Sequence, residues 1–216
     1  MLPSFKKRDF EAKVAVRSPY QKDTVADVYI SVDIETDGPI PGPFSMLSFA
    51  MVEVGVYDGV KLVRPPVPRT FYRELKPISD QFEAAAMAVN GLDRTGLSVN
   101  GGDPGDVMRE ARQFVAELAS QGTPVMVAYP LSFDWSFLYW YFVSFGNHSP
   151  FNHSRCFDVK TAVAVKGHRM ITQAGRDLLP DFLKGSLSHT HHALDDAIEQ
   201  AEIFARVFDW DGEYER

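Results

Sequence analysis

The order of apolar and polar positions predicts strands in the first third of the chain. A β-branched, apolar run over residues 28–34 indicates a buried central strand. Apolar segments at 46–57 and 70–75 predict two more strands, and turn signals such as Asp58-Gly59 separate them. Because short links join these three strands, we expect them to form an antiparallel meander.

Helical spacing dominates the rest of the chain. Apolar residues recur with a helical period, interrupted by two short apolar runs that read as buried strands. The predicted helices cover 79–89, 105–121, 133–145 and 193–208, and the strands 123–128 and 155–158. A meander followed by alternating strands and helices predicts an α/β fold with a mixed central β-sheet, antiparallel meander plus parallel strands, flanked by helices.

Composition is consistent with one folded domain. The 216 residues are 45% hydrophobic, enough for a core of its own. No repeat or long linker divides the sequence, so we expect one domain over 26–210, a basic arm over 1–25 and an acidic tail over 211–216. The single cysteine, Cys156, excludes an internal disulfide framework and favours a reducing, cytoplasmic location. Neither a secretory signal nor a membrane span is expected.

The formal net charge of −7 argues against a polyanionic partner unless metal ions intervene. Residues 1–22 carry a net charge of +4, so the remaining chain carries −11. The basic arm is open to two interpretations, contact with nucleic acid or a solvated tail. An acidic body binds phosphate where divalent cations reverse the local field.

Three acidic residues near predicted strand ends are candidates for metal binding. Asp33 and Glu35 are two residues apart on a strand, so their carboxylates face the same side. Such closeness is costly without a cation, although acids are also common at solvated strand ends. Asp134 follows a strand and lies one turn before the apolar Leu138, which points its carboxylate inward. The alternative is an acid favoured by the dipole at a helix start.

On the last predicted helix, the neighbouring Asp195 and Asp196 point in different directions. Its core stripe includes Leu194, Ala197 and Ala201, whereas Asp195, Glu199, Glu202 and Arg206 share a face that we expect to be solvent-exposed. Asp196 belongs to neither face, which places it at the border of a second surface.

A histidine-rich run precedes this helix. His191 can lie near Asp196, where a neutral imidazole is suited to accept a proton from water. The alternative is a surface residue in a run with His189 and His192. A zinc site made of all three histidines is disfavoured, because adjacent histidines rarely converge on one ion.

The segments that carry Asp33 and Glu35, Asp134, and His191 and Asp196 together resemble the three motifs of the DEDDh 3′–5′ exonucleases. This is the proofreading-exonuclease and RNase T-like family, which has a ribonuclease H-like fold. The matching stretches are 33–38, 132–135 and 191–197, and 89–92 resembles a family connector. One position departs from the family. Pro130 stands where an Asn is common, and proline offers neither an amide side chain nor a backbone donor.

The resemblance implies a metal-dependent 3′–5′ exonuclease that releases nucleoside 5′-monophosphates from the 3′ end of single-stranded DNA or RNA. Two Mg²⁺ or Mn²⁺ ions are implied, which suits carboxylate ligands. By resemblance, Asp33 contacts both ions, Glu35 and Asp196 complete the shell of the first, and Asp134 holds the second. His191 takes the proton of the attacking water. The implied substrate-binding residues are Thr36, Asp37, Gly38, Phe44, Met46 and Phe133, with core packing as the alternative for Met46.

Two other functions stay open on the sequence. The first is a non-catalytic interaction domain that retains the fold, for which Pro130 is the only support. The second is an exonuclease restricted to oligoribonucleotides or structured RNA, because no motif reports contacts to a 2′-hydroxyl. Homodimers occur among relatives of this family, and no segment here identifies an interface.

Overall fold

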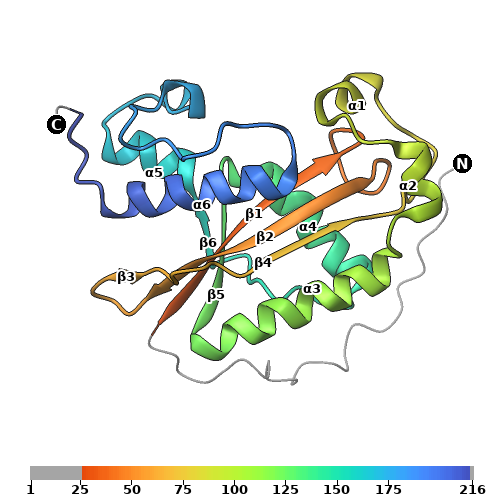
Figure 1. Ribbon diagram of the computed structural model, residues 1–216, viewed down its shortest axis with the longest axis horizontal. Coiled ribbons are helices and arrows are strands. Elements are labelled where there is room, and N and C mark those ends of the chain that lie inside the picture. Colours follow the sequence, from red (N-terminus) through yellow and green to blue (C-terminus); the bar gives the residue numbers. More distant parts are fainter. Residues whose placement is uncertain (1–25, 215–216) are drawn as a thin grey trace, which may run out of the picture.

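A computed structural model describes residues 26–214, and its centre is one mixed sheet (Figure 1). The central strand β1 (Asp27–Thr36) pairs antiparallel with β2 (Met46–Tyr57) and parallel with β5 (Thr123–Ala128). The sheet order is β3-β2-β1-β5-β6, with β4 also paired to β2. The remaining strands are β3 (Leu62–Val63), β4 (Thr70–Glu74) and β6 (Cys156–Asp158). The predicted combination of an antiparallel meander and parallel strands is confirmed.

Helices cover both faces of this sheet and enclose two apolar cores (Figure 1). On one face lie α3 (Pro104–Leu118) and α4 (Leu131–Phe145), whose apolar side chains pack with Ile30, Val32 and Ile34 of β1. On the other face lie α5 (Val159–Lys166) and α6 (Ala193–Asp209). Because β1 is covered on both sides, its run of apolar residues is buried throughout.

Two short helices stand beside the C-terminal end of β1. These are α1 (Ala84–Asn90) and α2 (Arg94–Asn100) (Figure 1). Asn90 donates from Nδ2 to the carbonyl of Thr36 at 2.9 Å, which ties α1 to the strand end. Three 3₁₀ turns, η1 (Ala119–Gln121), η2 (Ile171–Gln173) and η3 (Arg176–Leu178), complete the elements.

The helix expected over 79–89 begins later, at Ala84. The segment before it is held by other partners, because the Glu83 amide donates to the carbonyl of Asp37 and Arg94 donates to the carbonyl of Ser79. Helices α2 and α5 were not expected. Each is only seven or eight residues long, so its apolar pattern is short: α2 buries Leu97 alone, and α5 buries Val159, Val163 and Ala164.

Within residues 26–214, no helix combines the length and the apolar character needed to cross a bilayer.

Candidate active site

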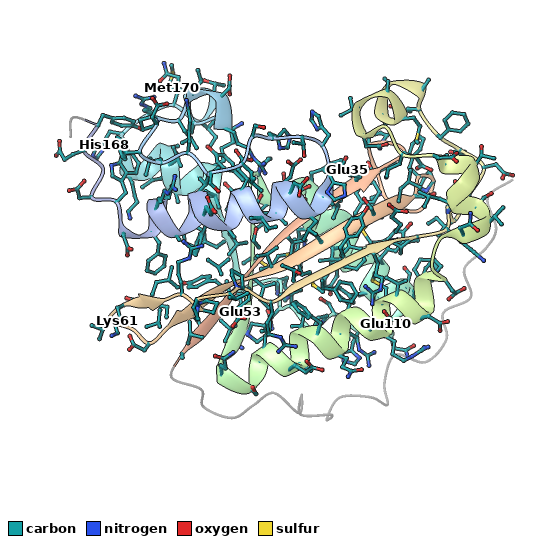
Figure 2. The ribbon with its side chains drawn as sticks, in the orientation of Figure 1. Glu35, Glu53, Lys61, Glu110, His168 and Met170 are labelled. Carbon is teal, nitrogen blue, oxygen red and sulfur yellow. The ribbon has the colours of Figure 1, made fainter. Side chains whose placement is uncertain are left out.

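The last residues of β1 bring two carboxylates to one face of the sheet. Asp33 and Glu35 are each less than a tenth exposed and lie on the side covered by α6. Figure 2 shows Glu35 at this end of β1, beside the beginning of α6. The two-residue period of a strand produces this arrangement, as the sequence predicted.

The first turn of α6 adds a third carboxylate. Asp196 is fully buried, and its oxygens accept hydrogen bonds from the backbone amides of Thr190 at 2.8 Å and His191 at 2.9 Å. These donors offset part of the cost of burying its charge. Oxygens of Asp33, Glu35 and Asp196 all lie within 4.8 Å of one another. The strand and the helix therefore converge on one point.

A fourth carboxylate reaches this point from α4. Asp134 lies in the first turn of that helix and is buried, as its position before Leu138 predicted. The amide of the preceding Leu131 donates to Asp158 Oδ2 at 2.6 Å. Asp158 also accepts from the amide of Thr161 in α5. The start of α4 is thus anchored by Asp158, even though Pro130 supplies no donor.

Burial and mutual repulsion raise the pKa of three of these four acids. The pKa of Asp33 is raised well above its usual range, first by burial and then by the charge of Asp134. Burial and the charges of Asp33 and Asp196 raise the pKa of Glu35 to about 8. Burial raises the pKa of Asp134 to about 7, although backbone hydrogen bonds and Arg176 oppose the change. Such crowding strongly favours binding of a cation.

The donor set fits a hard divalent cation. Carboxylate oxygens are the ligands preferred by Mg²⁺ and Mn²⁺, and three of them already lie within mutual reach of a single ion. The fourth, on Asp134, is close enough for its charge to raise the pKa of Asp33. The residues present therefore match the metal requirement implied by the sequence motifs.

Two histidines of the histidine-rich run face this cluster and one does not. His191 has a positive φ of 58°, an uncommon conformation for a non-glycine residue, and its ring lies 4.5 Å from that of His189. His189 Nδ1 is 3.0 Å from Asp196 Oδ2. The ring of His192 instead packs on Tyr72 at 5.0 Å. His189 and His191 are exposed and both line the cavity over the carboxylates.

The expected solvent face of α6 is also wrong at one position. Glu199 is only 7% exposed, and its Oε2 lies 3.1 Å from Nη1 of Arg176. The irregular segment between α5 and α6 folds over this side of the helix, where Ser186 bonds to Glu202. Asp195 remains half-exposed and lies 3.5 Å from His192.

A cavity of about 720 Å³ opens over the carboxylates. Among the predicted substrate-binding residues, Thr36, Gly38 and Phe133 line it. The ring of Phe44 packs directly against Gly38, since a Cβ added there would lie 2.1 Å from the ring. Gly38 thus makes room for the ring of Phe44 in the connection between β1 and β2.

Two predicted substrate-binding residues have structural partners instead. Asp37 is fully buried, pairs with Arg94 Nε at 2.8 Å, and accepts from the amide of Ser45. Met46 is fully buried in the core next to Tyr141, so it offers no surface to a base. The core-packing alternative therefore describes Met46.

Several cavity residues were not identified from the sequence. One wall comes from α1, and cations and a histidine come from α5 and the segment after it. These residues are Ala85, Ala86, Val89, Lys160, Arg176 and His189. The connector-like stretch 89–92 was a signal for the α1 wall. No comparable signal marked Arg176, because the segment that carries it has no helical or strand period.

The sequence is similar to those of known 3′-5′ exonucleases. The model of the 3′-5′ exoribonuclease Rv2179c-like domain matches residues 28–208. The chain is 35% identical over 185 residues to the 3′-5′ DNA exonuclease Cap18 of Escherichia coli, covering 85% of this chain and 93% of that protein.

Solved structures show the same fold at low sequence identity. The nuclease domain of 3′hExo, a DEDDh family member bound to rAMP, has a TM-score of 0.61 at 14% identity, covering 86% of this chain and 92% of that one. S. pombe Pop2p in its Mg²⁺- and Mn²⁺-bound form has a TM-score of 0.60 at 14% identity, covering 87% and 86%. E. coli Exonuclease I in complex with a dT13 oligonucleotide has a TM-score of 0.57 at 15% identity, covering 85% and 41%.

The fold, the order of the acidic motifs and these matches agree. The resemblance to the DEDDh exonucleases is confirmed, and with it the enzymatic nature of the protein, in place of a non-catalytic interaction domain. The chain belongs to the family of 3′-5′ exoribonuclease Rv2179c-like domains and is a 3′–5′ exonuclease.

Proposed function

We propose that this exonuclease removes nucleoside 5′-monophosphates from the 3′ end of single-stranded DNA or RNA, using two Mg²⁺ or Mn²⁺ ions. The observation that carries the proposal is the convergence of four buried carboxylates: Asp33, Glu35 and Asp134 line one cavity, and Asp196 lies within reach of the first two. Four buried carboxylates at one point have a high cost unless they serve a cation.

The carboxylates divide into two groups. Asp33, Glu35 and Asp196 have oxygens within mutual reach and would hold one ion. Asp134, which comes from α4, would hold the second ion together with Asp33. When bound, the ions neutralise phosphate charge and stabilise the attacking and leaving oxygens of the displacement.

The proton of the attacking water requires a separate acceptor. His191 lines the cavity and is fixed through its backbone amide to Asp196. Its imidazole is the proposed general base. His189, which contacts the carboxylate of Asp196 directly, is less free to accept that proton because Arg176 Nη1 lies 2.9 Å from its Nδ1.

The cavity walls suit a terminal nucleotide. Apolar side chains from α1 and α4, including Val89 and Phe133, face the carboxylates across the opening. Phe133 is 40% exposed, which leaves ring area for stacking on a base. Lys160 supplies a positive charge within reach of a phosphate backbone.

Degradation of matched oligomers tests the proposal. Single- and double-stranded DNA and RNA of one sequence, labelled at the 5′ end, are incubated with Mg²⁺, Mn²⁺ or EDTA. We expect a ladder of shortened products from single strands with a free 3′ hydroxyl, released 5′-monophosphates, and no shortening in EDTA. An Asp33→Asn variant is the matched control.

The choice of substrates also separates the alternatives. The family description names an exoribonuclease and the E. coli relative a DNA exonuclease, so the relative rates on DNA and RNA define the substrate class. Shortening of RNA alone would support the trimming alternative. Shortening in EDTA, or by Asp33→Asn at the normal rate, contradicts the two-metal proposal.

A further inference from the structure

Arg176 places a positive charge inside the carboxylate cluster. It belongs to η3, in the segment between α5 and α6, and its side chain is only 16% exposed. Nη2 lies 3.6 Å from Asp33 Oδ1, and Nη1 lies 3.1 Å from Glu199 Oε2. Two buried carboxylates, Asp33 and Glu199, lie within ion-pair distance of this guanidinium. Three more buried carboxylates belong to the same cluster through Asp33, namely Glu35, Asp134 and Asp196. Within residues 26–214, no other Lys or Arg forms an ion pair with any of them.

The same guanidinium also connects the three segments that carry the proposed metal ligands, namely β1, the start of α4 and α6. It donates to the carbonyl of Tyr129 at 3.2 Å, just before α4, and to Gln200 Oε1 on α6 at 2.9 Å. The amide of Gln200 continues the network into β1, donating to Ser31 Oγ at 2.8 Å and to the carbonyl of Val32 at 2.9 Å. One side chain therefore links β1, α4 and α6.

These two properties have opposite consequences for metal binding. The hydrogen bonds hold the three segments together, which favours a preformed site. The charge acts against a cation, because a guanidinium beside Asp33 repels a divalent ion bound to that carboxylate. In metal-free protein, the same charge offsets the repulsion among the carboxylates.

We propose that Arg176 is the resident counter-charge of this site, which stabilises the metal-free fold and weakens the binding of divalent cations. The inference rests on the proposed function, because it assumes that these carboxylates bind metal. Arg176 is then a positioning residue whose charge sets the metal concentration at which the enzyme becomes active.

A purely structural brace makes a different prediction. Loss of a brace lowers stability and also disorders the ligands, so metal affinity falls. Loss of a counter-charge lowers stability in EDTA but raises metal affinity. The sign of the change in affinity therefore separates the two roles.

The experiment uses the full chain and two neutral substitutions, Arg176→Met and Arg176→Gln. Calorimetric titration with Mn²⁺ measures affinity, and thermal unfolding in EDTA and in saturating Mn²⁺ measures stability. We expect a lower Tm in EDTA, a larger gain in Tm with Mn²⁺, and a Kd reduced by about tenfold or more, the scale of unit charges a few ångströms apart. Arg176→Gln keeps a donor for the Tyr129 carbonyl, so it serves if Arg176→Met does not fold.

Two controls complete the design. Arg176→Lys keeps the charge and loses the planar fork, so its Kd should remain near that of the wild type. Arg94→Met removes another largely buried arginine, paired with Asp37 outside the cluster, and should lower Tm without tighter metal binding.

The outcomes distinguish this inference from the function on which it rests. Weaker Mn²⁺ binding in both neutral variants, or an unchanged Kd, overturns the counter-charge role while leaving the exonuclease proposal intact. If the wild-type protein binds no Mn²⁺ and shortens no oligomer, the proposed function itself fails, and the counter-charge role fails with it.

Discussion

The backbone amide of His191 donates a 2.9 Å hydrogen bond to Oδ2 of Asp196, five residues later in the chain. This bond closes the turn that leads into α6, and the amide of Thr190 bonds the other carboxylate oxygen. The aspartate therefore has two tasks, as proposed metal ligand and as the group that folds the histidine segment over the site. The spacing of the His-x4-Asp motif follows from this turn.

Asp195 and Asp196 provide a matched pair for testing the orientation of α6. We expect Asp196→Asn to lose metal binding and activity, because it removes a buried ligand and weakens the turn that carries His191. Asp195→Asn should change activity by less than about twofold, since its side chain is half-exposed and its ion pair is with the exposed His192. Calorimetric metal titration and nuclease rates check both. Equal losses in the two variants contradict the assignment.

The histidine-rich run provides a second pair. His191→Ala should reduce kcat by about 10²–10⁴-fold, the usual contribution of general-base catalysis. Metal affinity should persist, because the proposed ligands are carboxylates. His192→Ala, whose ring lies on Tyr72 away from the cavity, is the control and should retain near-normal turnover. A loss of metal binding in His191→Ala would reassign that histidine as a ligand.

The residues on regular elements were predictable from the sequence. Strand alternation placed Asp33 and Glu35 on one face, and the apolar stripe of α4 aimed Asp134 inward. The helical period of α6 placed Asp196 on a different face of the helix from Asp195. In each case a local period fixes the direction of the side chain, so no knowledge of distant contacts was needed.

The errors arise where distant segments meet. Glu199 lies on the expected solvent face of α6, yet the segment between α5 and α6 covers it and brings Arg176 against it. That segment has no strand or helical period, so the sequence gives no direction for Arg176 or His189. The choice between the two interpretations of Met46 also depended on a distant segment, because Met46 shares its core with Tyr141 of α4, whose hydroxyl accepts from the Met46 amide.

Asp33 tests the cluster as a whole. Asp33→Asn should reduce the rate by at least about 10³-fold, since bound metals contribute several kcal/mol to such displacements. In EDTA its Tm should equal or exceed that of the wild type, because the substitution removes a buried charge crowded by Asp134. Circular dichroism and oligomer assays on the same preparation check both results. A folded Asp33→Asn protein with normal turnover rules out the assignment.

The raised pKa values of the acids predict how stability depends on pH when metal is absent. In the unfolded chain Glu and Asp titrate near pH 4, whereas in the folded protein the pKa of Glu35 is about 8 and that of Asp134 about 7. The folded state therefore binds more protons across this window. Stability in EDTA is highest near the lower end and is lost as pH rises through 7 and 8.

Metal should reverse this trend, because a bound cation takes the place of the protons. We expect Tm in EDTA to fall between pH 6 and 9, and the gain in Tm from Mg²⁺ to grow over the same range. Glu35→Gln supplies the control, since removing the group with pKa of about 8 should flatten the upper part of the EDTA curve. A Tm in EDTA that rises from pH 6 to 9, or a gain from Mg²⁺ that shrinks, would show that these carboxylates are already ionised in the metal-free protein.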